Sequence, residues 1–177
     1  MLHHLFAQWS VEDLVIARTA FPVDLTPYTD TGFIGPYEYG ARPNIVPGVP
    51  FYLYGNQYPG GKAFNPAAFT DPAPGTEGDL GRNTLRGFGL WQDNFALHRQ
   101  FNITERVSVQ FRAESFNLLN HPAFADPYGS EPIQSPFFGI STGSLANGQS
   151  NGAGNGLNSL YQTGAPRSWQ FGLKLSF

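Results

Sequence analysis

The chain carries the stretch Arg167-Ser-Trp-Gln-Phe-Gly-Leu-Lys-Leu-Ser-Phe177, in which apolar and polar or small residues alternate strictly. Successive side chains of a β-strand point to opposite faces, so the stretch predicts a strand with one apolar and one polar face. The apolar face holds Trp169, Phe171, Leu173, Leu175 and Phe177, and the polar face holds Ser168, Gln170, Gly172, Lys174 and Ser176. With a rise of about 3.3 Å per residue and a tilt of about 45°, this strand covers roughly 25 Å, the height of the apolar band of an outer-membrane barrel. Taken alone, the stretch also fits an edge strand of a soluble sandwich.

Composition favours strands and turns over helices. Charged residues make up 13% of the 177 residues, against about 25% in typical soluble domains, and aromatic residues make up 15%. The sequence contains no run of about 18 apolar residues, which excludes a membrane-spanning helix. The net charge of −3 and the absence of a basic cluster argue against a nucleic-acid partner. The absence of cysteine excludes disulfides and thiolate metal sites.

Three further segments alternate in the same manner, near residues 8–25, 90–101 and 107–119. Asp13 and Asp93 interrupt the apolar faces of the first and second segments. In the third segment the apolar character changes face beyond Ser115, which indicates either a bulge or the exit of the strand from the membrane. Together with residues 167–177, these segments give four predicted strands.

The lengths of the connections alternate as well. Residues 102–106 form a polar turn of hairpin length, whereas residues 27–89 and 121–166 are long and rich in Gly, Pro and Asn. Outer-membrane barrels place short turns in the periplasm and longer loops outside the cell. The sequence therefore predicts an all-β fold, an antiparallel transmembrane β-barrel fragment with two long extracellular loops, located in the cell outer membrane.

Particular residues add a family resemblance. The stretches Leu80–Trp91, Phe101–Phe124 and Arg167–Phe177, together with Phe21–Asp24 and Arg42–Asn44, resemble the carboxyl-terminal strands of TonB-dependent outer-membrane receptors. The resemblance extends to the large acidobacterial type that carries a carboxypeptidase-regulatory-like domain at its amino end. The terminal Phe177 resembles the signal recognised by the barrel-assembly machinery.

This resemblance implies a barrel of about 22 strands, of which residues 1–177 supply about four. It also implies nutrient uptake driven by the TonB complex, which acts through amino-terminal regions that have no counterpart in this sequence. A plug domain and a signal peptide likewise have no counterpart, so we expect a fragment that does not transport alone. The expected partners are outer-membrane lipid, the barrel-assembly machinery and a small-molecule, peptide or carbohydrate substrate.

The candidate ligand contacts are aromatic. Tyr52, Tyr54 and Tyr58 lie in the first long loop, where exposed tyrosines either bind sugars or peptides or pack the loop onto the barrel rim. We expect membrane anchoring from the apolar face of residues 167–177. Seven polar residues are predicted to face the lumen: Gln92, Asn94, His98, Arg112, Glu114, Gln170 and Lys174.

No residue pattern indicates catalysis, a metal site or a cofactor. His3 and His4 are predicted to be a polar terminus, Gly148–Gly156 a flexible linker, and Asp71, Glu77 and Asp79 solvated loop residues. The alternative function is a secreted all-β polysaccharide-binding module. That module would be a soluble monomer, whereas a barrel fragment would need detergent because no second sheet covers its apolar face.

Overall fold

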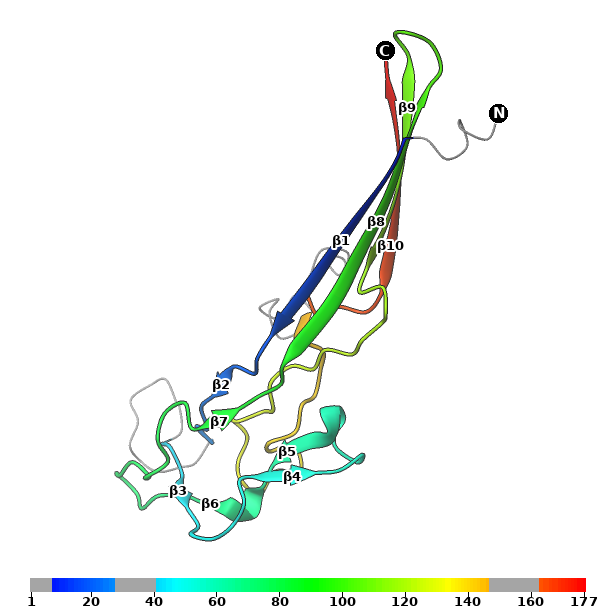
Figure 1. Ribbon diagram of the computed structural model, residues 1–177. Coiled ribbons are helices and arrows are strands. Elements are labelled where there is room, and N and C mark those ends of the chain that lie inside the picture. Colours follow the sequence, from blue (N-terminus) through cyan, green and yellow to red (C-terminus); the bar gives the residue numbers. More distant parts are fainter. Residues whose placement is uncertain (1–7, 28–40, 147–162) are drawn as a thin grey trace.

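A computed structural model describes residues 8–27, 41–146 and 163–177. The predictions for His3, His4 and Gly148–Gly156 lie outside these residues. The described chain has two parts: a long, narrow sheet and a folded region at one end of it (Figure 1). No helix within the described ranges has the length and apolar character needed to cross a bilayer.

The long sheet contains the four predicted strands. They are β1 (Trp9–Arg18), β8 (Leu90–Asn102), β9 (Ser108–Phe116) and β10 (Ser168–Ser176). The strand order is β1-β8-β9-β10 and every neighbouring pair is antiparallel. The fold prediction, an antiparallel all-β barrel fragment, is confirmed.

The register puts all four apolar faces on one side of the sheet. Phe95 lies opposite Asp13 on β1 and Ser115 on β9, and Ser115 in turn lies opposite Trp169 on β10. Odd-numbered residues therefore share one face across all four strands, because side chains alternate along each of them. That face carries most of the apolar residues of the sheet, including the series from Trp169 to Leu175.

Two strands end earlier than the sequence pattern predicts. The first was expected to reach residue 25, but β1 ends at Arg18, opposite Leu90, the first residue of β8. The chain turns away from the sheet before Leu90, so β1 has no partner beyond this point. The third was expected to reach residue 119, but β9 ends at Phe116 because Asn117 adopts a left-handed conformation with φ of 54°. The change of face beyond Ser115 is thus the end of the strand.

The first long connection folds into paired short strands. These are β2 (Pro22–Val23) with β7 (Leu85–Arg86), β3 (Asn44–Ile45) with β6 (Phe69–Thr70), and β4 (Tyr52–Tyr54) with β5 (Lys62–Phe64). Two 3-10 turns, η1 (Pro59–Gly61) and η2 (Pro66–Ala68), flank β5. We call the described residues 19–27, 41–89 and 120–146 the loop cap.

One hydrophobic core joins both long connections. Leu25, Phe64 and Leu85 from the first connection cluster with Ile133 and Phe138 from the second, and Phe64 is 0% exposed. The second connection doubles back on itself, as Ala125 N–H donates to Gly143 O and Tyr128 N–H donates to Ile140 O. The two stretches predicted as long loops do connect strands of the long sheet. Their described residues also fold into one packed body, which the sequence analysis did not predict, because their apolar residues bury one another across the two connections.

The two ends of the long sheet differ. The loop cap lies at the end where β1 finishes and β8 begins, whereas the turn between β8 and β9 and the end of β10 lie at the other end (Figure 1). The short turn and the long connections thus lie at opposite ends of the sheet, as the sequence predicts.

Candidate functional site

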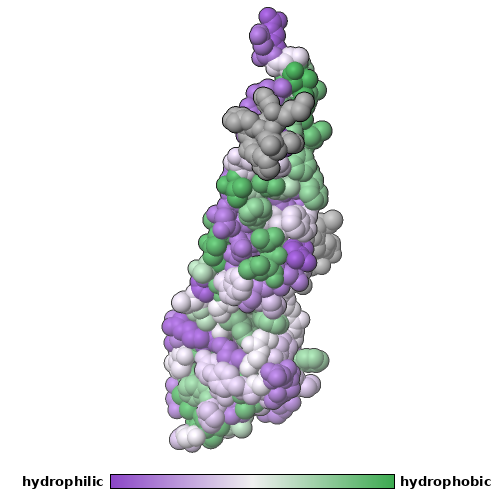
Figure 2. Space-filling view, turned by 45° about the vertical axis from the view of Figure 1, so that its right-hand side comes forward, coloured by the Kyte–Doolittle hydropathy of each residue, from purple (hydrophilic) through white to green (hydrophobic). Residues whose placement is uncertain are grey.

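The apolar face of the long sheet lies open. Leu173 is 76% exposed and Phe171 is 67% exposed, and no described residue packs over them as a second sheet. In Figure 2 hydrophobic side chains gather along one side of the narrow upper part of the molecule, whereas the wider lower part is a mixture of polar, apolar and intermediate residues. An exposed apolar sheet face of this kind matches the lipid-facing wall of an outer-membrane barrel.

Two carboxylates interrupt this face. Asp13 lies opposite Phe95, and Asp93 lies opposite Val15, so the two acids occupy diagonal positions on neighbouring strands. The sequence marks each aspartate as a misfit, but only the strand register brings them together.

The opposite face is polar. The register places all seven residues predicted for the lumen on this side, and some of them pair. His98 Nδ1 lies 3.6 Å from Glu12 Oε1, and the Arg112 guanidinium forms an ion pair with the Glu114 carboxylate. Arg112 and Glu114 therefore pair within the sheet itself.

Gln92 and Asn94 also form hydrogen bonds with residues outside the long sheet. The Gln92 side chain is 3% exposed; its Oε1 accepts from Gly164 N–H at 2.7 Å, and its Nε2 donates to Asn94 Oδ1 at 2.7 Å. Asn94 Oδ1 also accepts from Asn117 N–H at 3.0 Å. These two side chains tie the sheet to the chain segments that leave it.

Asn117 makes most of the hydrogen bonds at this junction between the sheet and the segments that leave it. The sequence analysis did not identify this residue. It is 2% exposed, its Nδ2 donates to the carbonyls of His121 and Ala165, and its Oδ1 accepts from His121 N–H. Asparagine tolerates the left-handed conformation that this position requires. An asparagine directly after an alternating strand is the signal that marks the position in the sequence.

A cavity of about 430 Å³ lies beside Asn117. Its walls come from the chain after β9, from residues 141–144 and from the chain before β10, with Pro59 of the first connection closing one side. His121 lines the cavity, and its ring contacts the Trp91 ring in a tilted arrangement, with 4.2 Å between the ring centroids and 36° between the ring planes.

The three candidate tyrosines have different environments. The Tyr52 ring packs against Phe64 with centroids 5.8 Å apart, and its hydroxyl accepts a hydrogen bond from Arg86 N–H at 2.8 Å. Tyr54 is 71% exposed, and Tyr58 is half-buried in the turn that η1 closes. Tyr52 therefore packs the cap, and Tyr54 is the one that offers an open ring.

Lys62 on β5 binds the chain at residues 86–87, beside Tyr52. Its Nζ donates to the carbonyl oxygens of Arg86 and Gly87 at 2.9 Å and 2.5 Å and lies about 5 Å from the centroids of the Tyr52 and Phe88 rings. Burial lowers the pKa of Lys62, and the negative charge of Asp126 partly opposes that change.

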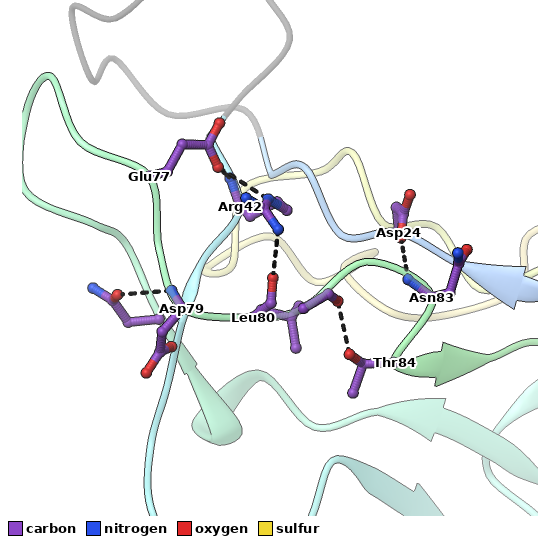
Figure 3. Close-up of polar contacts among 9 residues, drawn as sticks. Asp24, Arg42, Glu77, Asp79, Leu80, Asn83 and Thr84 are labelled. Atoms are coloured by element: carbon purple, nitrogen blue, oxygen red, sulfur yellow. Dashed lines mark hydrogen bonds and ion pairs between the residues drawn. The ribbon is translucent and has the colours of Figure 1, made fainter.

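Two acidic residues of the first connection, Glu77 and Asp79, bind other residues of the loop cap. Glu77 forms an ion pair with Arg42, with 3.1 Å between Oε2 and Nε, and Asp79 Oδ1 accepts from Ile45 N–H at 2.7 Å. Figure 3 shows Arg42 bridging Glu77 and the Leu80 carbonyl, with Asp24 accepting from Asn83 N–H nearby. Across the described ranges, no three His, Cys, Asp or Glu side chains come together as a metal site.

Comparison with known proteins supports the architecture. The profile of one family, described as an outer membrane beta barrel domain, matches residues 1–167. Searches of curated proteins and of solved structures returned no match. The match covers nearly the whole chain and agrees with the apolar sheet face, the short turn and the long connections. The chain belongs to the outer membrane beta barrel domain family and is a protein of the outer membrane.

Proposed function

We propose that the chain forms carboxyl-terminal strands of a TonB-dependent receptor that imports a scarce nutrient across the outer membrane. The observation that carries this proposal is the loop cap, in which both long connections share one core at a single end of the sheet. A folded cap on the extracellular side gives a transporter a preformed surface for its ligand. The resemblance of Leu80–Trp91, Phe101–Phe124 and the last strand to TonB-dependent receptors favours this class of barrel.

The two edge strands of the sheet are an argument for a larger barrel. In the described sheet β1 and β10 each have one neighbour, so each has one edge facing away from the sheet. An unpaired backbone group in lipid costs several kcal/mol, so further strands are needed to close the wall. In the proposed receptor, strands outside this chain close it, and a plug fills the polar interior that His98, Arg112 and Lys174 face.

The proposed role is transport, without a catalytic step. The TonB complex acts on amino-terminal regions of the receptor, while this chain supplies lipid anchors, lumen wall and extracellular cap. Within the cap, Tyr54 is the proposed contact for a sugar or peptide ligand because its ring is open. The proposed roles of Tyr52 and Tyr58 are to support the β4–β5 hairpin.

Genetics in the native host tests this proposal. Strains lacking the full-length gene, the gene for TonB, or both are compared for growth on single limiting nutrients. If the receptor depends on TonB, the two single deletions share a defect on one nutrient, and the double deletion is no worse. A defect that appears without the receptor gene but not without TonB would overturn the proposal.

The reading frame upstream of Met1 gives an independent test. A TonB-dependent receptor needs about 2,500 bases of open frame encoding further alternating segments and a plug. Stop codons close to Met1, with no such segments behind them, would contradict a receptor.

A further inference from the structure

The cavity beside Asn117 is a site whose walls are held in place. Its volume, about 430 Å³, falls in the range of small-molecule sites, about 300–1,000 Å³. Asn117 Nδ2 holds the Ala165 carbonyl at 2.9 Å, and Gln92 holds Gly164 at 2.7 Å. On the other side, Ala125 N–H donates to Gly143 O at 2.9 Å. The cavity therefore exists before any ligand arrives.

The chemistry of the lining defines what it can hold. Among the described residues that line the cavity there is no lysine, arginine, aspartate or glutamate. Three proline rings and the Phe124 ring give flat apolar walls, from Pro59, Pro122 and Pro166. The Asn120 amide and the hydroxyls of Thr142 and Ser144 form polar points along the same lining. Burying a net charge in such a site is unfavourable because the described lining contains no carboxylate, ammonium or guanidinium group to pair with it.

From this lining we propose that the cavity binds an uncharged ring with one apolar face and a hydroxyl-bearing edge. The apolar face packs on the proline and Phe124 walls, and the edge hydrogen-bonds to the amide and hydroxyl groups. A pyranose unit of a glycan and a phenolic ring share this chemistry. The proposal rests on the proposed function for the ligand's arrival from outside the cell, and it extends that function by naming the class of substrate.

Trp91 provides a reporter for the site. Its ring contacts the ring of His121, which lines the cavity, so a ligand that shifts the imidazole changes the surroundings of the indole. The full-length protein is labelled with 5-fluorotryptophan in detergent, and the Trp91 resonance is assigned by its loss in Trp91→Phe. Methyl β-D-glucopyranoside and 4-methylphenol serve as neutral probes, and the methyl β-D-glucuronide anion and 4-hydroxybenzoate serve as their charged counterparts.

We expect saturable movement of the Trp91 resonance with at least one neutral probe, at a Kd of about 1 mM, as is usual for a single small ring. The charged counterpart should bind about tenfold more weakly or not at all. A response to the glucoside identifies the ligand as a sugar unit of a glycan, and a response to the phenol identifies it as a phenolic compound. Absence of response to both neutral probes, or equal binding of the charged counterpart, would overturn the proposal.

Two variants connect the response to the cavity. Thr142→Phe fills it from an exposed lining position and should abolish the shift, whereas Thr70→Phe, at an exposed position on β6, should leave it unchanged. Binding that survives Thr142→Phe contradicts the assignment. The two proposals fail separately, because TonB-independent growth leaves ring binding intact, and a silent cavity leaves TonB-dependent uptake intact.

Discussion

Asn117 N–H donates a hydrogen bond of 3.0 Å to Oδ1 of Asn94, which fixes the end of β9 against the polar face of β8. Through Asn117 the same junction reaches the Ala165 carbonyl, 48 residues along the chain. The start of β10 is therefore positioned by the end of β9 as well as by the ladder between these strands.

Replacing Asn117 should destabilise the protein strongly. Asn117→Gly keeps access to the left-handed conformation but removes the side-chain bonds to His121 and Ala165, so we expect a loss of about 2–3 kcal/mol in free energy of unfolding. Urea unfolding measures it. Asn56→Gly, at an exposed position, is the matched control. Equal losses in both variants would show that Asn117 is not a hub.

A charge on the apolar sheet face should impair membrane insertion. Leu173→Lys puts an ammonium among lipid chains, at a cost of about 2–4 kcal/mol near the bilayer centre. We expect a lower folded fraction in the outer membrane by heat-modifiable gel mobility. The control is Gln100→Lys. Gln100 lies on the polar face in the row of Lys174, next to the row of Leu173, and this variant should insert normally. Similar insertion of the two variants would contradict the assignment of the faces.

Tyr54 and Tyr52 should separate ligand contact from packing. Tyr54→Ala is expected to weaken uptake by the full-length receptor while leaving barrel yield unchanged, because its ring is exposed. Tyr52→Ala should lower yield, since it removes packing against Phe64 and the bond to Arg86 N–H. Unchanged uptake in Tyr54→Ala removes this residue from the ligand site.

Arg42 should matter more than its ion-pair partner. Glu77→Gln breaks a partly exposed ion pair and should cost less than about 1 kcal/mol. Arg42→Met also removes the bond to the Leu80 carbonyl and should cost about 1 kcal/mol more. Thermal unfolding of both variants and the double variant measures the difference. A larger loss in Glu77→Gln than in Arg42→Met would refute this ranking.

Lys62 should make stability depend on pH in the alkaline range. Its pKa in the folded protein is below the ordinary 10.5, so between these two values the unfolded chain binds more protons and stability rises with pH. The wild-type protein should therefore gain stability relative to Lys62→Met as pH rises through the folded pKa towards 10.5, with a constant difference at lower pH. Urea midpoints across this range test the sign, and a difference that falls with pH would contradict it.

Alternation in the sequence was enough to predict the long sheet. Residues 167–177 and the three other alternating segments each show their two faces locally, because side chains in a strand repeat every two residues. Residues 102–106 predict the hairpin in the same way. The membrane location and the polar and apolar faces of the sheet follow from these local patterns.

Only the tertiary structure decided the cap and the junction. Phe64 and Phe138 share a core although they belong to different connections, and Gln92 holds Gly164 across 72 residues of chain. Asp13 and Asp93 meet through the register of β1 and β8. No period in the sequence encodes such contacts, because they depend on which distant segments the folded sheet brings to the same place.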